Sequence, residues 1–353
     1  MDVYSLIYPI LSFLIACGLA YILGLKSDRL GVMDAPDGAR KTQDRPVSRL
    51  GGAIIAVATL AAFYIALSLF LIGFGSDVIS ALKSSFLGGI GEVGTLTVFV
   101  LGAFLLGLLD DLFTINTALK LGLLMLLCIA TSVFGLHVET LNSPFGDISF
   151  LPALIAGSVL WLLVFTNATN FMDGSNGLSI GCVTIMLIGL CFALVSIDSF
   201  TIGKWMFPLF GAILGFLIHN LRDKLYAGDT GALGLGALFA SLGLVSGLEV
   251  WTIATLALPF LIDVLMTLIW RAKHKRSWLD AHLDHAYQRL RLSGWTHIET
   301  AVLYWGLTAT CAAAAVIAAK AGGEAPFIIF WTLCLAGIVL WTLHRRSGPT
   351  QNA

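Results

Sequence analysis

Charged side chains are scarce in this 353-residue sequence. Only 12% of the residues are Asp, Glu, Lys or Arg, whereas 58% are hydrophobic. A soluble chain carries about 25% charged residues, so this one could not cover a water-facing surface. The same composition excludes intrinsic disorder. The net charge of −1 shows no basic excess, so nothing indicates a nucleic-acid partner. The composition is that of a protein of the lipid bilayer.

Metal-binding and redox patterns of Cys and His are also missing. None of the six cysteines forms a C-x-x-C pair and each lies in an apolar run, so we interpret them as small buried hydrophobic residues. The sequence has no H-E-x-x-H motif, which excludes a metalloprotease of that type. No polar segment is long enough to fold alone, and we expect residues 1–353 to form a single integral membrane domain.

Long apolar runs stand in place of charge. A helix needs about 20 apolar residues to cross the hydrocarbon core, and we predict an all-α, polytopic protein with ten or eleven transmembrane helices. Asp2 and no basic residue precede the first run, so we expect a retained span and not a signal peptide. The runs are 5–24, 52–73, 95–109, 118–136, 150–166, 178–197, 205–219, 233–248, 250–270, 299–319 and 326–343.

The distribution of Lys and Arg predicts the orientation. With the N-terminus outside, sixteen of the 20 basic residues fall in inside segments, three fall outside, and Lys120 lies within a span. We therefore predict an N-terminus on the outer side, which in a bacterium is the periplasm. The predicted cytoplasmic segments are 25–51, 110–117, 167–177, 220–232, 271–298 and the tail 344–353.

Unusual polar residues gather on this cytoplasmic face. Asp110 and Asp111 end the third run, and two adjacent acids suit a hard cation such as Mg²⁺ or a general base. Asn167, Asn170 and Asp173 follow the fifth run at a spacing that shares one helical face, and they suit a metal or a diphosphate. The alternatives are a stop signal at the water interface for the acids and a polar turn for the second group.

Two more clusters lie on the same face. Asp229 stands in a glycine-rich turn that opens a helix, where it either holds Mg²⁺ against a phosphate or caps the helix. His282 and His285 lie in a basic loop that suits either neutralisation of a phosphate or contact with anionic lipid. We expect the other five histidines to be incidental: His137, His219, His274, His297 and His344.

Five segments, taken in order, resemble the polyprenyl-phosphate N-acetylhexosamine-1-phosphate transferases. They are residues 34–52, 107–111, 167–174, 228–231 and 282–289. That family includes phospho-N-acetylmuramoyl-pentapeptide transferase and the enzymes that initiate O-antigen, enterobacterial common antigen and teichoic acid. The fifth segment is most similar to the subgroup that starts O-antigen on undecaprenyl phosphate.

The resemblance implies a reaction, a cofactor and partners. A UDP-linked N-acetyl sugar and undecaprenyl phosphate would give undecaprenyl-diphospho-sugar and UMP, with Mg²⁺ or, in its place, Mn²⁺. UDP-GlcNAc, UDP-GalNAc and 6-deoxy sugars all fit as donors, and both a one-step and a covalent mechanism stay open. The implied location is the bacterial cytoplasmic membrane, with an active site on the cytoplasmic face, and family members suggest a homodimer.

The resemblance also assigns roles to residues. Asp229 would bind Mg²⁺ with Asn170 as a second ligand, and Asp110 or Asp111 would deprotonate or orient the lipid phosphate. Lys120 would meet phosphate, and Asp173 completes the catalytic set. The remaining residues would bind the nucleotide, the diphosphate or the sugar: Lys41, Asn167, Asn170, Asn176, Tyr226, His282, His285 and Arg289.

Some positions depart from the family pattern. Thr114 stands where a third acid is usual, and Asn176 replaces an Asp, which removes a base and favours hydrogen bonding to uracil. A secondary transporter with a cytoplasm-facing polar site is the alternative function. It would place polar residues near mid-membrane, whereas here they lie at one edge, apart from Asp263 in the ninth run, to which we assign no role.

Overall fold

The fold is all-α in this computed structural model apart from two very short strands. The structure describes residues 3–30, 33–34, 46–74, 92–199, 206–278, 280 and 282–347. In chain order the elements are α1 (Val3–Leu30), β1 (Met33–Asp34), β2 (Val47–Ser48), α2 (Gly51–Phe74), α4 (Glu92–Phe113), α5 (Thr117–Val133), α6 (Leu151–Phe171), α7 (Leu178–Ser196), α8 (Phe207–Asn220), α9 (Gly228–Val245), α10 (Val250–Lys273), α11 (Ala286–Leu292), α12 (His297–Ala321) and α13 (Ala325–Ser347).

Seven of these helices are long and apolar enough to cross a membrane, namely α4, α6, α7, α9, α10, α12 and α13. Shorter apolar stretches lie in α1, α2, α5 and α8. Each of the predicted apolar runs falls on one of these helices. The all-α membrane fold is therefore confirmed, while the number of spans and the side of the N-terminus stay predictions.

The helices extend further into the polar segments than the apolar runs predicted. The helix α4 continues to Phe113 and α6 to Phe171, whereas α9 already begins at Gly228. An apolar run marks only the part of a helix that suits hydrocarbon, and the backbone hydrogen bonds continue until a turn interrupts them. The predicted loops were therefore too long at 25–51, 110–117, 167–177, 220–232 and 271–298, the last of which contains α11.

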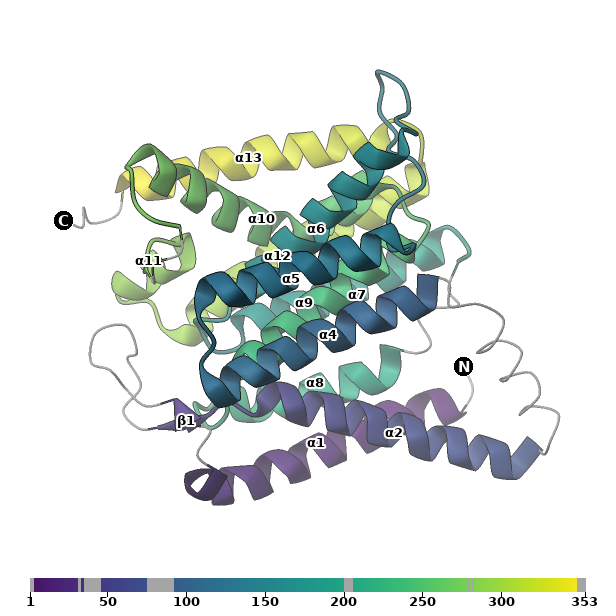
Figure 1. Ribbon diagram of the computed structural model, residues 1–353, viewed down its shortest axis with the longest axis vertical. Coiled ribbons are helices and arrows are strands. Elements are labelled where there is room, and N and C mark those ends of the chain that lie inside the picture. Colours follow the sequence, from purple (N-terminus) through teal and green to yellow (C-terminus); the bar gives the residue numbers. More distant parts are fainter. Residues whose placement is uncertain are drawn as a thin grey trace.

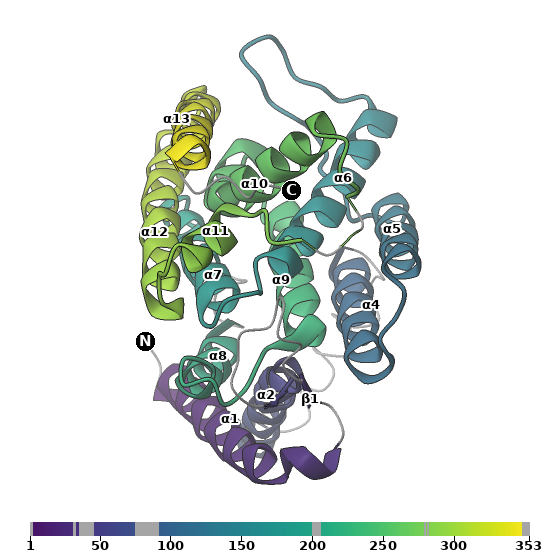
Figure 2. The same ribbon diagram turned by 90° about the vertical axis from the view of Figure 1, so that its left-hand side faces the viewer.

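The helices α7 and α9 lie at the centre of the bundle. Figure 2 views the helices nearly end-on, and both lie inside a ring made by the others. In each of these two spans 72% of the residues are buried, against 11% in α13. A helix that is apolar all round suits such a central position. The ends of α9 are thus fixed by neighbours on every side.

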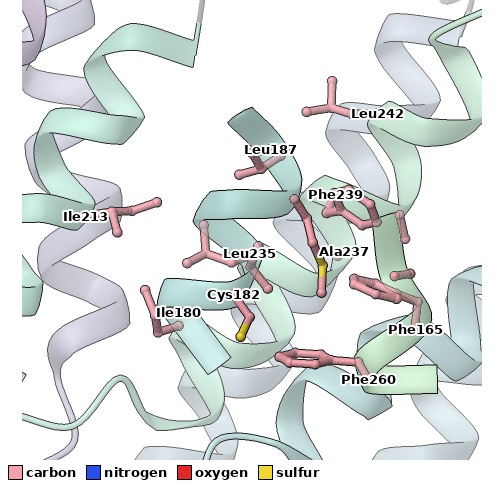
Figure 3. Close-up of a cluster of buried hydrophobic side chains, with 14 of the residues drawn as sticks. Phe165, Ile180, Cys182, Leu187, Ile213, Leu235, Ala237, Phe239, Leu242 and Phe260 are labelled. Carbon is pink, nitrogen blue, oxygen red and sulfur yellow. The ribbon is translucent and has the colours of Figure 1, made fainter. Parts of the chain in front are cut away.

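Aromatic side chains join the central helices. The ring centroids of Phe165 on α6 and Phe239 on α9 lie 4.7 Å apart, and those of Phe165 and Phe260 on α10 lie 6.4 Å apart. Figure 3 shows these rings in the same buried cluster as Cys182 of α7. Tight packing of large rings prevents α6, α9 and α10 from sliding past one another along their axes. Their relative positions along the bundle are therefore fixed.

Close backbone contacts hold the first turn of α9. A Cβ atom added to Gly52 of α2 would overlap the backbone of Gly231, and one added to Gly107 of α4 would overlap the carbonyl of Asp229. Only glycine permits this approach. The backbones of α2 and α4 therefore contact the first turn of α9, which carries Asp229.

A short backbone ladder joins the N-terminal segment to the same place. The strands β1 and β2 pair antiparallel, with Met33 opposite Ser48. The Tyr226 N–H donates to the Ser48 carbonyl at 2.8 Å, and the Gly51 N–H donates to the Tyr226 carbonyl at 2.9 Å. The residues just before α9 are thus fixed to those just before α2.

Candidate functional site

Lys120 joins two carboxylates that are far apart in sequence. Its Nζ lies 2.8 Å from Oδ2 of Asp110 and forms an ion pair with Asp229 as well. Asp110 lies in the last turn of α4, Lys120 lies in the first turn of α5, and Asp229 lies in the first turn of α9. The Asp229 side chain is 26% exposed and the other two are 15% exposed. The cluster is therefore accessible, mainly at Asp229.

The turn between α4 and α5 explains how Lys120 reaches Asp110. The Ile115 N–H donates to Oδ1 of Asp110 at 2.6 Å. The Asn116 side chain caps α5 by accepting from the Ala118 N–H at 2.9 Å, a standard role for Asn at a helix start. A sharply reversed chain thus points the first turn of α5 back at the end of α4.

Asp111 faces the backbone of α9. Its Oδ1 accepts from the Asp229 N–H at 3.0 Å, and its Oδ2 accepts from the Thr230 N–H at 2.9 Å and the Thr230 hydroxyl at 2.6 Å. A carboxylate is well placed at a helix N-terminus, and this one is only 8% exposed. The two adjacent acids therefore differ: Asp110 joins the charged cluster and Asp111 positions Asp229.

The end of α6 meets the same cluster. The Asn170 amide donates to Oδ2 of Asp229 at 3.3 Å. The Asn167 amide instead donates to the Leu163 carbonyl of its own helix at 2.8 Å. The structure thus brings together Asp110, Asp111, Lys120, Asn170 and Asp229, and it points the Asn167 amide elsewhere.

Asp173 follows α6 and carries a proton at neutral pH. The Ser179 hydroxyl donates to its Oδ1. Burial, with a smaller contribution from the negative charges of Asp229 and Asp111, raises the pKa of Asp173 to about 8. A neutral carboxyl beside a carboxylate cluster can approach a diphosphate without repulsion.

Asn176 is buried and its amide donates to Asp223. His297, at the start of α12, contacts the same turn. Its Nδ1 lies 2.9 Å from the Ser175 hydroxyl, and it accepts from the Asn176 backbone N–H at 3.3 Å. We expected His297 to be incidental. No motif surrounds it, and its partners lie more than a hundred residues away, so only the fold reveals it as part of the site's wall.

Tyr226 precedes α9, and its backbone belongs to the ladder with Ser48 and Gly51. Its ring is half-buried, and burial raises the pKa of its phenol to about 12. The phenol is therefore neutral at pH 7, and a neutral ring can stack on a nucleotide base. Lys41 lies outside the described residues.

His282, His285 and Arg289 have partners in α10, α13 and their own segment. His285 is buried, with Nδ1 3.5 Å from Oδ1 of Asp263. Arg289 donates to the Arg345 carbonyl at 3.2 Å. Burial, aided by nearby positive charge, lowers the pKa of His282 to about 4. His282 is therefore neutral at pH 7 in the ligand-free protein, and its role toward phosphate stays a prediction.

Comparison with known proteins gives a consistent picture. The model of glycosyl transferase family 4 matches residues 93–247, from the start of α4 to just beyond α9. The matched segment contains the cluster of Asp110, Lys120, Asn170 and Asp229 and excludes the histidine segment.

The similar proteins come from bacteria. The phospho-N-acetylmuramoyl-pentapeptide-transferase of Listeria welshimeri is 29% identical over 254 residues, which are 65% of this chain and 76% of that protein. The probable undecaprenyl-phosphate N-acetylglucosaminyl 1-phosphate transferase of Bacillus subtilis is 26% identical over 315 residues, 86% of this chain and 81% of that protein. A phospho-N-acetylmuramoyl-pentapeptide-transferase from Synechococcus is 32% identical over 54% of this chain and 57% of its own. The resemblance predicted from the five segments is confirmed.

Proposed function

We propose that this chain transfers a phospho-N-acetyl-sugar from a UDP-sugar to undecaprenyl phosphate, with release of UMP. The match of residues 93–247 to the model of glycosyl transferase family 4 supports this proposal. The observation that carries the proposal is the cluster in which Lys120 holds Asp110 and Asp229 together. The names of the relatives support it, because they describe transferases of sugar phosphates and an undecaprenyl-phosphate acceptor.

The cluster supplies what this reaction needs. An oxygen of the lipid phosphate attacks the phosphorus next to the sugar, the bond from that phosphorus to the bridging oxygen breaks, and UMP leaves. Since both reactants are anions, catalysis consists mostly of positioning and charge neutralisation. The Lys120 ammonium offsets negative charge, and Asp110 accepts a proton from the lipid phosphate or orients it.

The residues at the cluster also suit Mg²⁺. Carboxylate oxygens of Asp110 and Asp229 and the amide oxygen of Asn170 are ligands that this ion prefers. Within the described ranges no group of three or more His, Cys, Asp or Glu side chains could hold a metal by itself, so substrate oxygens would provide further ligands. When bound, the ion would offset charge on the diphosphate and the leaving UMP.

The donor would lie between the cluster and the neighbouring segments. In this proposal Asp173, Asn176 and Tyr226 contact the uridine and diphosphate, and His282, His285 and Arg289 contact the diphosphate or sugar. The neutral Asp173 carboxyl supports this arrangement because it can donate a hydrogen bond to a phosphate oxygen.

We further propose that the site faces the cytoplasm of a bacterial inner membrane and starts O-antigen or another envelope polysaccharide. Figure 1 supports one shared face, because β1, α11 and the turn between α4 and α5 lie at one end of the bundle, and the connection from α5 to α6 lies at the other. Basic residues in the last turn of α10, Arg271 and Lys273, and of α11, Arg289 and Arg291, belong to the first of these ends.

A reconstituted assay tests the proposal. Purified protein, undecaprenyl phosphate, Mg²⁺ and a panel of UDP-N-acetyl sugars are mixed, and UMP and lipid products are followed by mass spectrometry. We expect UMP and the matching lipid diphosphate from at least one sugar. Uptake of a UDP-sugar into vesicles without UMP would instead support the transporter.

A further inference from the structure

Asp263 is a buried carboxylate in α10 that the proposed chemistry does not use. Its exposed fraction is 2%, and it lies ten residues from the cytoplasmic end of its helix at Lys273. Burial of a carboxylate is costly unless several hydrogen bonds satisfy it. Its partners therefore show what the residue is for.

Most of those partners belong to one short stretch of chain. Oδ1 of Asp263 accepts from the Ala286 N–H at 2.7 Å, and Oδ2 accepts from the Tyr287 N–H at 3.2 Å. The ring nitrogen Nδ1 of His285 lies 3.5 Å from Oδ1. Two of these three contacts are hydrogen bonds from main-chain N–H groups, so Asp263 fixes the path of the backbone at the start of α11.

Two hydroxyl groups complete the arrangement. The Thr267 hydroxyl, one turn along α10, donates to Oδ1 of Asp263 at 3.4 Å. The Tyr304 hydroxyl donates to Oδ2 of Asp263 at 2.6 Å, and Tyr304 itself is buried. The histidine segment is thus tied through one carboxylate to two membrane helices, α10 and α12.

Tyr287 carries this restraint to the proposed donor site. It is 1% exposed, and its hydroxyl donates to the Phe171 carbonyl at the end of α6 at 2.9 Å. A Cβ atom at Gly174 would overlap the phenol oxygen, so only glycine allows this contact. The ring therefore lies against the stretch between Asn170 and Asp173.

We propose that Asp263, together with Tyr304, is a positioning residue that holds the segment 282–289 against the end of α6 and so sets the affinity for the diphosphate of the nucleotide-sugar donor. The inference rests on the proposed function, in which His282 and Arg289 contact the diphosphate or the sugar of the UDP-sugar. Asp263 itself touches no substrate and acts through Ala286 and Tyr287.

The test compares Asp263→Asn with the wild-type protein in the reconstituted assay. The amide keeps the size of the side chain but presents an N–H₂ group to a site filled with donors. We expect the KM for the UDP-sugar to rise about tenfold, the effect of losing one hydrogen bond to a charged group, while kcat and the KM for undecaprenyl phosphate stay near wild type. Asp263→Glu should restore part of the affinity.

Hydrogen exchange supplies a readout that needs no turnover. The amides of residues 286–292 should exchange faster in Asp263→Asn, while those of α7 and α9 keep their wild-type rates. Thr255→Val is the matched control, because Thr255 is a buried residue of the same helix whose hydroxyl bonds only to the Trp251 carbonyl. It should change neither the donor KM nor the exchange of α11.

Two results would overturn the proposal. One is a folded Asp263→Asn protein with wild-type donor KM and wild-type exchange at α11. The other is a uniform rise of both KM values and of exchange throughout the bundle, which marks a residue of general stability. If Asp263→Asn does not fold, Tyr304→Phe and Tyr287→Phe each remove one hydroxyl, and the same selective rise in donor KM is expected. If the wild-type protein showed no turnover, the proposed function would be refuted. Hydrogen exchange would then still test whether Asp263 positions α11.

Discussion

At the residue scale, Asp229 is the meeting point of the site. Its carboxylate pairs with Lys120 and accepts from Asn170, and its backbone N–H is held by Asp111. Three separate helices thus fix one side chain that stays partly exposed. A group that is held in place and still accessible suits stabilisation of charge in a transition state.

Asp229→Asn should therefore lower kcat by about 10²–10³-fold, the typical loss on removing one preorganised charge-stabilising group. The variant should still insert into the membrane, because the amide fits the same space. UMP release by the purified protein measures the effect. Asp147→Asn, a change in an exposed connecting segment, serves as the control, and wild-type turnover by Asp229→Asn would contradict the assigned role.

Asp173 predicts a pH dependence. Its pKa of about 8 keeps the carboxyl neutral at pH 7 and charges it at higher pH, where it repels the donor diphosphate. The donor KM should rise as the pH passes about 8, and Asp173→Asn should abolish that rise. In the unfolded chain the Asp173 carboxyl ionises near pH 3.8. Its raised pKa in the folded protein therefore lowers stability progressively as the pH rises from about 4 to about 8, and this loss stays constant above pH 8. A pH-independent wild-type KM would contradict the assignment.

Sequence alone could predict which residue types gather at the site but not all of their partners. Asp110, Lys120, Asn170 and Asp229 lie in recognisable local patterns, and the fold brings them into contact. Asp263 and His297 lie in no such pattern. Their partners Tyr304 and Ser175 are distant in sequence and approach only through helix packing.

At the element scale, the helices could be predicted from apolar runs, whereas their ends could not. Hydrophobicity stops at the edge of the hydrocarbon, but Asp110 and Asn170 continue their helices by one more turn. The short helix α11 escaped prediction because it is polar and depends on Asp263 for its start. The site consists of helix ends, so more of its backbone is hydrogen-bonded in helices than the predicted loops implied.

The contact between α4 and α9 gives a prediction for Gly107→Ala. The added methyl would overlap the Asp229 carbonyl, so the first turn of α9 must shift. We expect a loss of about 1–3 kcal/mol in stability, as for other overpacked sites, together with reduced kcat. Thermal unfolding in detergent and UMP release measure the two effects.

Gly122→Ala is the matched control for that change. Gly122 lies in α5, and an added Cβ meets nothing within 4 Å, while alanine favours the helix. Its stability should equal or exceed that of wild type. Equal behaviour of the two variants would show that α4 and α9 can separate at no cost.

At the scale of the whole molecule, the basic last turns of α10 and α11 lie at the same end of the helical bundle as the turn between α4 and α5. The opposite end carries apolar, exposed side chains such as Phe145, which is 92% exposed. The two ends therefore differ in the way that a fixed orientation in a membrane requires.

Cysteine labelling tests that orientation. A membrane-impermeant thiol reagent applied to intact cells should label Phe145→Cys and should reach Arg222→Cys only after the membrane is opened. Arg222 is an exposed residue of the segment between α8 and α9. The unmodified protein, whose described cysteines are buried or half-buried, gives the background. Reversed labelling would place the site on the outer side.

The central claim is transfer of a sugar together with its phosphate, and oxygen-18 in the non-bridging oxygens of the β-phosphate of the UDP-sugar tests it most directly. After reaction with undecaprenyl phosphate, mass spectrometry locates the label. The account predicts a labelled lipid diphosphate and unlabelled UMP in equal amounts. Label retained in released UDP, with the sugar alone on the lipid, would contradict it.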